Sequence, residues 1–355
     1  MTGPGPVVGD VGEIDLLRRL QPHLAGAGGG LAVPAGDDAA VWQPAAGMSV
    51  VVTTDSLVEE VHFHRRPNDA VFNRDLGWKL LAISLSDLAA MGASAGPSFL
   101  ALTFPADWPV ADVEALYDGL SECAAAHGAT LAGGNLSGGA TTVLTSTCLG
   151  SVAPGFALLR QGAQPGWNLA VTGRVGGAAA ALRVLHDPDP EAAAAFSGDT
   201  LAAWTARLRR PEPRLREAAI LVAEGIPVCL DVSDGLYLDC ARLLGDGLGV
   251  VIDSETVPLA DGVREAFPAD WIEIAGGGED YELLFAGSAE MVEAACLRVI
   301  AGGGEAHVIG RFDGTPGLRL NTASGEEREA PSAGHEHFAP SAPDTGSDII
   351  SSRHG

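Results

Sequence analysis

The sequence predicts a mixed α/β (α+β) protein with two domains. Strand-like runs of β-branched residues alternate with segments of helical periodicity, and 355 residues with 46% hydrophobic content are enough for two cores. The composition changes after Pro154, where a Gln- and Gly-rich stretch (161–166) separates two αβ blocks. We therefore expect an N-terminal domain at 1–153, a C-terminal domain at 154–340 and a disordered tail at 341–355.

The composition is acidic, with 46 Asp and Glu against 21 Lys and Arg and a formal charge of −25. Such a chain has little nonspecific attraction for nucleic acid or anionic membranes, so we expect neither as a partner. The five cysteines include no C-x-x-C pair, which argues against a zinc site and a disulfide framework. The first ten residues do not resemble a signal peptide, and no apolar run is long enough to span a bilayer. These features predict a soluble cytoplasmic protein.

The chain opens with a helix predicted at 13–23, which ends in a Gly-rich stretch at 25–30. Gly36-Asp37-Asp38-Ala39 then precedes a strand that begins at Val41. Two adjacent carboxylates in this position fit either a solvated turn or a ligand site.

The run Val50-Val51-Val52 predicts a buried strand, and Thr53-Thr54-Asp55 places oxygen ligands at its end. A long helix is predicted next, at 72–91, with Asp87 near its C-terminus. A carboxylate there opposes the helix dipole, and a bound cation would offset this. A cation ligand and an ordinary surface residue both remain open for Asp87.

A strand at 98–104, a helix at 110–127 and strands at 129–132 and 141–152 complete the first block. Between the last two strands, Gly133-Gly134-Asn135 predicts a glycine loop. Such a loop lets backbone amides approach a phosphate, although it also serves as a plain hairpin connection.

The second block begins with a strand at 169–172, a glycine turn and an alanine-rich helix, without the G-x-G-x-x-G fingerprint of a dinucleotide site. A linker or surface helix (187–197), an amphipathic helix (215–224) and a strand (227–230) follow. That strand delivers Asp231-Val232-Ser233-Asp234-Gly235, whose Ser or Asp could bind a ligand or cap the next helix. Strands at 248–252 and 281–286 come later, the second preceded by Gly276-Gly277-Gly278-Glu279-Asp280.

Several carboxylates recur at or near the ends of predicted elements: Asp38, Asp55, Asp87, Asp231 and Asp234. A carboxylate-rich, histidine-poor set of oxygen donors favours magnesium over zinc. Magnesium among carboxylates usually accompanies a bound phosphate, which points to phosphoryl transfer. Neither a Walker A sequence nor the protein-kinase motifs are present.

Taken together and in order, these motifs resemble the thiamine-monophosphate kinase family over about residues 12–338. The motifs are Gly36-Asp37-Asp38-Ala39, Thr53-Thr54-Asp55, His62-Phe63, Leu85-Ser86-Asp87-Leu88-Ala89-Ala90-Met91-Gly92, Gly133-Gly134-Asn135, Asp231-Val232-Ser233-Asp234-Gly235 and Gly277-Gly278-Glu279-Asp280-Tyr281-Glu282-Leu283. The first acidic patches alone would indicate only the wider PurM-like ATP-binding superfamily.

The resemblance implies a PurM-like fold in which the N-terminal αβ domain forms a homodimer through its sheet and the C-terminal αβ domain closes over the site. It implies that ATP, with several Mg²⁺ ions, phosphorylates thiamine phosphate to thiamine diphosphate by direct in-line transfer, without a covalent nucleophile.

The resemblance also implies a role for each matching residue. Metal-assisted transfer is implied for Asp55, Asp87 and Asp231. The implied magnesium ligands are Asp38, Thr53, Thr54, Asp55, Asp87, Asn135, Asp231 and Asp234. The implied nucleotide contacts are Tyr117, Gly134, Asn135, Arg160 and Ser233, and the implied substrate contacts are His62, Glu279 and His335.

Two positions depart from the family pattern. Asn135 stands where the family usually has aspartate, which predicts weaker binding of one ion, and His335 stands where an aromatic residue packs on the substrate. Two alternatives therefore stay open. One is another PurM-like ATP-dependent enzyme, such as a relative of aminoimidazole-ribotide or selenophosphate synthetase. A relative of selenophosphate synthetase should carry a reactive cysteine near its N-terminus, whereas the first cysteine of this chain is Cys123. The other is a weakly active protein that binds nucleotide or thiamine phosphate.

Overall fold

The computed structural model describes residues 5–24, 26, 30–186 and 198–331, so the predicted segment 187–197, His335 and the predicted tail lie outside the described residues. The helices are α1 (Val8–Leu20), η1 (Gln21–His23), α2 (Ala70–Ala90), α3 (Val110–His127), α4 (Gly177–Leu185), α6 (Gly198–Arg209), α7 (Leu215–Ala223), α8 (Leu236–Ala241), η2 (Ser254–Thr256), α9 (Val263–Ala266), α10 (Trp271–Ala275) and α11 (Ala289–Ala301). The strands are β1 (Leu31–Val33), β2 (Val41–Trp42), β3 (Ser49–Val58), β4 (Ser94–Phe104), β5 (Thr130–Gly138), β6 (Val143–Val152), β7 (Asn168–Thr172), β8 (Val228–Asp231), β9 (Gly249–Asp253), β10 (Leu283–Gly287), β11 (Ala306–Asp313), β12 (Gly317–Asn321) and β13 (Glu327–Glu329).

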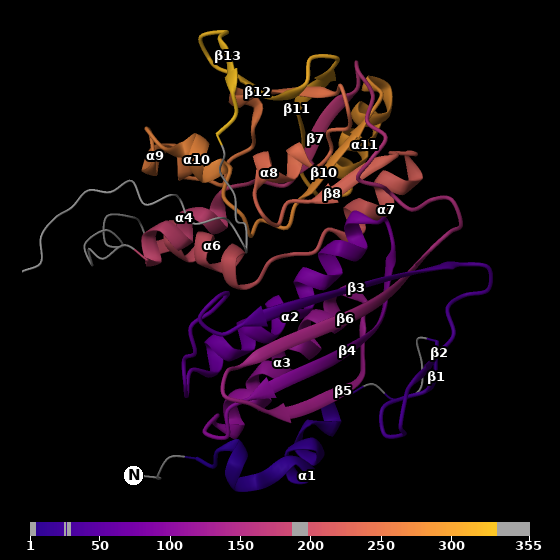
Figure 1. The fold of residues 1–355 in the computed structure, drawn as a ribbon, viewed down its shortest axis with the longest axis vertical. Helices are drawn as coiled ribbons and strands as arrows, with labels where there is room; N and C mark the ends of the chain where they lie inside the picture. Colours follow the sequence, from indigo (N-terminus) through magenta and orange to yellow (C-terminus); the bar gives the residue numbers. More distant parts are fainter. Residues whose placement is uncertain (1–4, 25, 27–29, 187–197, 332–355) are drawn as a thin grey trace, which may run out of the picture.

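A four-stranded sheet organises the N-terminal half, in the order β3-β6-β4-β5. The strands run antiparallel except for the parallel pair β4–β5. Helices α2 and α3 pack behind the sheet in Figure 1, and a core that includes Leu80, Leu116 and Leu144 fills the space between. The side chains of β6 alternate strictly between buried and half-exposed, as expected for a sheet covered on one face only.

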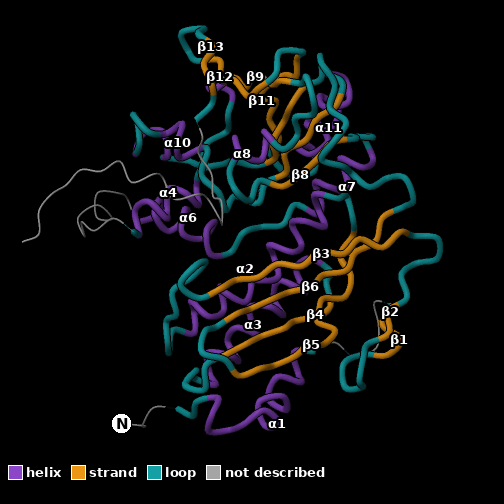
Figure 2. The backbone as a smooth tube through the Cα atoms, in the orientation of Figure 1, coloured by secondary structure: helices purple, strands orange, loops and turns teal. Residues whose placement is uncertain are grey.

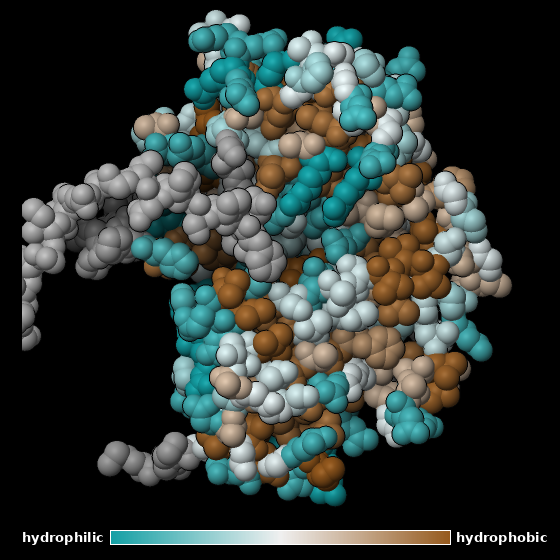
Figure 3. Space-filling model, in the orientation of Figure 1, coloured by the Kyte–Doolittle hydropathy of each residue, from teal (hydrophilic) through white to brown (hydrophobic). Residues whose placement is uncertain are grey.

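The other face of this sheet is open in the single chain. Val50 and Val52 lie on it and are 47% and 60% exposed, whereas Val51 faces the core. The prediction of a fully buried valine run is therefore wrong, because α2 and α3 cover only one side of β3. Figure 3 shows apolar atoms gathered over the right-hand part of this face, with more polar atoms towards the left.

A seven-stranded sheet organises the C-terminal half, in the order β13-β12-β9-β11-β7-β10-β8, with β12–β9 as its parallel pair. One apolar cluster joins one sheet face to α7 and α11, and a second joins the other face to α8 and α10. Two packed αβ layers with mixed sheets confirm the predicted fold class (Figure 2). The change from one sheet to the other falls between Val152 and Asn168.

Several predicted boundaries differ from the structure. The first helix begins at Val8 rather than at residue 13 and is kinked at Gly12, whose φ is 71°. Strand β3 continues past Asp55 to Val58, so Asp55 lies within the strand and not at its end. The predicted glycine loop is part of β5. There, a Cβ on Gly134 would lie 1.9 Å from the carbonyl oxygen of Leu100, so glycine is needed for close strand pairing.

Helix α2 connects the two halves of the molecule. It packs against β3 and β6 of the first sheet, and its far end reaches β8 and α7 of the second (Figure 1). The Trp78 indole Nε1 also donates a hydrogen bond of 2.8 Å to the Pro211 carbonyl oxygen. Within the described residues, no helix combines the length and apolarity needed to cross a bilayer.

Candidate active site

A cleft of about 1360 Å³ lies between the two halves of the molecule, and α2 forms much of one wall. Residues from β3, α2, β8 and the loop before β10 face it. The cleft brings together these predicted site residues: Thr54, Asp55, His62, Asp87, Arg160, Asp231, Ser233, Asp234 and Glu279. These residues come from segments that are far apart in the sequence and that the fold brings together.

Two serines near the C-terminal end of α2 hold carboxylates from different sheets. Ser84 donates a hydrogen bond of 2.8 Å to Asp55 Oδ2 on β3, and Ser86 donates one of 2.8 Å to Asp231 Oδ2 on β8. Both serines are fully buried. Sequence reasoning gave neither serine a role, although Ser86 stands directly before the predicted ligand Asp87.

Asp87 lies in the last turn of α2, where it opposes the helix dipole. No basic residue occupies that turn, and Thr53 on β3 donates a hydrogen bond to the Asp87 Oδ2 atom. Thr53 therefore contacts a predicted metal ligand rather than lining the cleft itself.

Asp87 raises the proton affinity of the other two carboxylates, Asp55 and Asp231. Burial, and next the negative charge of Asp87, raise the pKa of Asp55 to about 6. The same two causes raise the pKa of Asp231 to about 7. Among the described residues, none of the three forms an ion pair with Lys, Arg or His. This group of acids, which we call the cleft carboxylates (Asp55, Asp87, Asp231), has hydroxyl partners but no paired cation.

The cleft carboxylates do not form a complete metal cage. In the described part of the chain, no three His, Cys, Asp or Glu side chains converge closely enough to hold an ion. Mg²⁺ is commonly held by one or two carboxylates together with phosphate oxygens and water. Oxygen-only donors and the uncompensated negative charge therefore fit magnesium bound together with a polyphosphate.

Asp234 is already paired in this structure. Its Oδ2 atom lies 2.5 Å from Arg242, which also binds Asp239 at 2.5 Å. The Asp239 carboxylate accepts the backbone amides of Asp234 and Gly235 at 2.9 and 3.0 Å. The alternative that Ser233 or Asp234 caps the following helix is wrong, because the N-cap of α8 is Gly235 and no side chain makes a capping hydrogen bond there.

The opposite wall carries Glu279, which has a positive φ of 78°. Its amide donates to the Ser233 carbonyl oxygen at 2.8 Å, and its Oε2 atom accepts the Tyr281 hydroxyl at 3.1 Å. The same Oε2 atom lies 2.7 Å from Lys79 Nζ on α2. Sequence reasoning missed Lys79, although it is the only lysine in the chain.

His62 lies at the turn that follows β3. Its Nδ1 atom accepts the Val58 amide at 3.0 Å, which fixes the orientation of the ring beside the cleft. The other ring nitrogen therefore carries the proton in this arrangement.

Besides Thr53, four predicted site residues in the described part of the chain do not line the cleft: Asp38, Tyr117, Gly134 and Asn135. Asp38 is an exposed turn residue between β1 and β2, and Tyr117 is buried in the core beside His23. Asn135 is exposed on edge strand β5, and register places it three strands from Ser56 of β3. That separation is about 14 Å.

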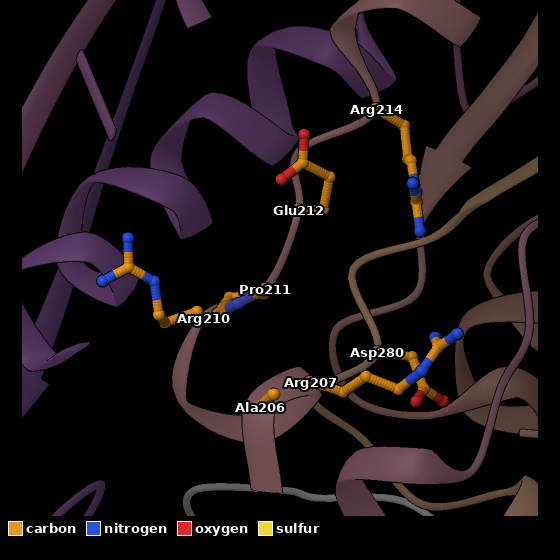
Figure 4. Close-up of a pocket in the computed structure, with 7 residues that line it drawn as sticks. All are labelled: Ala206, Arg207, Arg210, Pro211, Glu212, Arg214 and Asp280. Atoms are coloured by element: carbon orange, nitrogen blue, oxygen red, sulfur yellow. The ribbon is translucent and has the colours of Figure 1, made fainter. Parts of the chain in front are cut away.

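A smaller pocket of about 270 Å³ lies beside the segment that joins α6 to α7 (Figure 4). The Arg207 side chain points towards Asp280, whereas Arg210 points away from both. Asp280 Oδ2 accepts the Gly176 amide at 2.8 Å, and its Oδ1 atom has no hydrogen-bond partner among the described residues. Burial raises the pKa of Asp280 to about 8. No predicted site residue lines this pocket.

Comparison with known proteins agrees with this geometry. Residues 36–152 match the model of the AIR synthase related protein, N-terminal domain. The chain is 37% identical to thiamine-monophosphate kinase of Methanopyrus kandleri over 76% of this chain and 82% of that protein. It is 32% identical to the crystal structure of thiamine-monophosphate kinase from Stenotrophomonas maltophilia K279a, with a TM-score of 0.76 over 89% of this chain and 96% of that one.

A third relative, AaThiL, was solved as a complex with AMPPCP and TMP. It is 24% identical and has a TM-score of 0.69 over 92% of this chain and 97% of that one, which shows a shared fold. The identities of the closer relatives, and the share of each chain that they cover, carry the family assignment. The chain belongs to the thiamine-monophosphate kinase family.

Proposed function

We propose that this chain transfers the γ-phosphoryl group of ATP to thiamine phosphate, which gives ADP and thiamine diphosphate. The observation that carries the proposal is the convergence of Asp55, Asp87 and Asp231 from both halves of the molecule, with no paired cation among the described residues. Family membership supports the same reaction. AaThiL, bound to AMPPCP and TMP, shows that one protein of this fold takes an ATP analogue and TMP together.

The cleft carboxylates would hold magnesium together with the phosphates of ATP, with Thr54 and Asp234 nearby. Bound magnesium supplies charge neutralisation as the phosphoryl group moves. Arg160 at the cleft offers a forked donor that suits phosphate oxygens. His62 and Glu279 face the same cleft as the proposed contacts for thiamine phosphate. Direct transfer needs no side-chain nucleophile, and all five cysteines are buried.

We also propose that the chain works as a homodimer formed through the open face of the first sheet. The exposed Val50 and Val52 on that face support this, because a second sheet would remove them from water. The edge residues Gly134 and Asn135 lie on the same sheet, so a partner's cleft could receive them. Light scattering should give twice the chain mass for the wild type, and Val52→Asp should give a monomer. A monomeric wild type would contradict the dimer.

The kinase reaction is tested with purified protein, ATP, Mg²⁺ and thiamine phosphate. Chromatography should detect thiamine diphosphate and ADP in equal amounts, and replacing magnesium by a chelator should stop both. Thiamine in place of thiamine phosphate is the matched control for the acceptor. If folded, dimeric protein forms ADP without thiamine diphosphate, or forms neither, the proposed function is wrong.

A further inference from the structure

The single lysine of this chain lies inside the proposed active site. The sequence contains twenty arginines and one lysine, Lys79. Lys79 is 7% exposed, and the one ion pair it forms among the described residues is with Glu279. Every other permanently positive side chain is an arginine, so we asked what a lysine can do at this position that an arginine cannot.

A lysine differs from an arginine in the way it changes partners. Its ammonium group is a compact charge on a flexible stem, whereas the guanidinium group is a rigid planar fork. The ammonium can therefore move from one anion to another by rotating its stem. Lys79 lies eight residues before Asp87 on α2, about 12 Å along the axis, and both residues line the cleft. Its side chain can thus reach the space between Glu279 and the cleft carboxylates.

The Lys79–Glu279 pair is balanced in charge and largely removed from water. The two side chains are 9% and 23% exposed, and Tyr281 and the Ser233 carbonyl hold the Glu279 loop in place. Separating the pair without a substitute would leave two poorly solvated charges, which is costly. A ligand that separates the pair must therefore bring a cation for Glu279 and an anion for Lys79.

We propose that Lys79 exchanges Glu279 for the phosphate of thiamine phosphate when the thiazolium cation of the substrate binds Glu279. This inference rests on the proposed function. The Lys79–Glu279 pair then selects ligands that carry both a cation and an anion, because only such a ligand replaces both partners. Thiamine carries the cation without the phosphate, so it leaves Lys79 without an anion.

A purely structural pair would behave differently. If Lys79 only fastens α2 to the Glu279 loop, its loss should weaken thiamine and thiamine phosphate alike. If Lys79 exchanges partners, its loss frees Glu279 for any cation but removes the donor for phosphate. Only thiamine phosphate should then lose affinity.

The test is calorimetric binding of thiamine phosphate and of thiamine to the full chain, with magnesium and AMPPCP present. Lys79→Met should weaken thiamine phosphate roughly 10- to 100-fold, the range for loss of a hydrogen bond to a charged group. Thiamine should bind as well as before, or more tightly. The matched control is Arg209→Met, which removes another cation lining the cleft that is not paired with Glu279. It should change the ratio of the two affinities less than about threefold.

A second measurement does not depend on how the variant folds. Because the chain has one lysine, protein labelled with ¹³Cε-lysine gives one side-chain resonance from the wild type. Thiamine phosphate should shift this resonance, and thiamine should shift it to a different position. One common position for both ligands would overturn the exchange.

The outcomes also separate this inference from the proposed function. A wild type that neither binds nor phosphorylates thiamine phosphate overturns both. A wild type that forms thiamine diphosphate, while Lys79→Met weakens both ligands equally or neither, overturns only the role of Lys79.

Discussion

Acidic side chains in two parts of this molecule differ in whether a cation within the fold pairs with them. In the C-terminal half, Glu282 is fully buried and accepts two hydrogen bonds from Arg214, at 2.7 and 2.6 Å. Thr172 adds a third at 2.8 Å, and Arg207 lies 3.8 Å away. This carboxylate has its countercharge within the fold.

Among the described residues, no ion pair of this kind involves the cleft carboxylates, although the charge of Arg160 acts on Asp231. Hydroxyl groups of Thr53, Ser84 and Ser86 satisfy some of their oxygens, but among the described residues no cationic side chain pairs with them. The comparison separates two uses of a buried acid. A carboxylate paired with arginine stabilises the fold, whereas unpaired carboxylates that share one cleft are arranged for a cation that arrives with a ligand.

The largest expected effect is on turnover. Asp87→Asn should lower the rate of thiamine diphosphate formation roughly 100- to 1000-fold, because it removes one charge that would hold magnesium against the phosphates. A coupled ADP assay measures this. Asp75→Asn is the matched control, because Asp75 is also on α2 beside the cleft but is paired with Arg210 at 3.3 Å. It should change the rate less than about fivefold. Equal losses in the two variants would contradict the distinction between the unpaired Asp87 and the paired Asp75.

For Glu282, the carboxylate paired with arginine, the effect of substitution should be on stability rather than on turnover. Glu282→Gln should lower the free energy of unfolding by about 3–5 kcal/mol, since Arg214 is left buried without its counterion. Urea denaturation measures this, and the fraction still folded should keep near-normal turnover. Glu255→Gln, which breaks an exposed pair with Arg264, should cost less than about 1 kcal/mol. Similar costs for both variants would contradict the assignment.

Asp280 is a further buried acid, and its raised pKa should make the stability of the fold depend on pH. Its pKa in the fold is about 8, against an ordinary value of 3.8, so the folded state holds a proton that the unfolded chain releases. Stability from this proton is complete below the ordinary value and is lost as pH rises towards 8, by at most about 1.4 kcal/mol per unit. Asp280→Asn has no proton to lose. Its stability relative to wild type should therefore rise from pH 5 to 8, and a constant difference would exclude an elevated pKa.

The smallest effect is expected at Asn135, one of the two positions that depart from the family pattern. Asn135→Asp adds one negative charge at the edge strand that we propose to reach a partner's cleft. The magnesium concentration for half-maximal activity should fall severalfold, because ligand charge tunes affinity for hard cations. Titrating magnesium at saturating ATP measures this. An unchanged midpoint would place Asn135 outside the metal site.

Where local chemistry was sufficient, sequence reasoning singled out residues that the fold brings to the cleft. The helix-dipole argument identified Asp87, and the strand end identified Asp231. It did not predict that Val50 and Val52 are exposed, because a run of valines does not show how many faces of a sheet are covered. Nor did it predict the glycine residues of β5 as strand, since their need for close pairing with Leu100 depends on tertiary contacts.

Other parts of the site depend on residues whose meaning appears only in three dimensions. Ser84 and Ser86 are ordinary helix residues until β3 and β8 bring Asp55 and Asp231 beside them. Lys79 could have been noticed as the only lysine, but its partner Glu279 is two hundred positions away in the sequence.

The central claim is that the cleft carboxylates have no ion-paired cation until a ligand supplies one. The most direct test is the melting temperature of wild type and Asp87→Asn at pH 8, in chelator and in magnesium with AMPPCP. In chelator, Asp87→Asn should melt at or above the wild-type temperature, because one repelling charge is gone. Magnesium with AMPPCP should raise the wild-type value strongly and the variant's little. If Asp87→Asn melts below wild type in chelator, Asp87 is a stabilising residue and the claim is wrong.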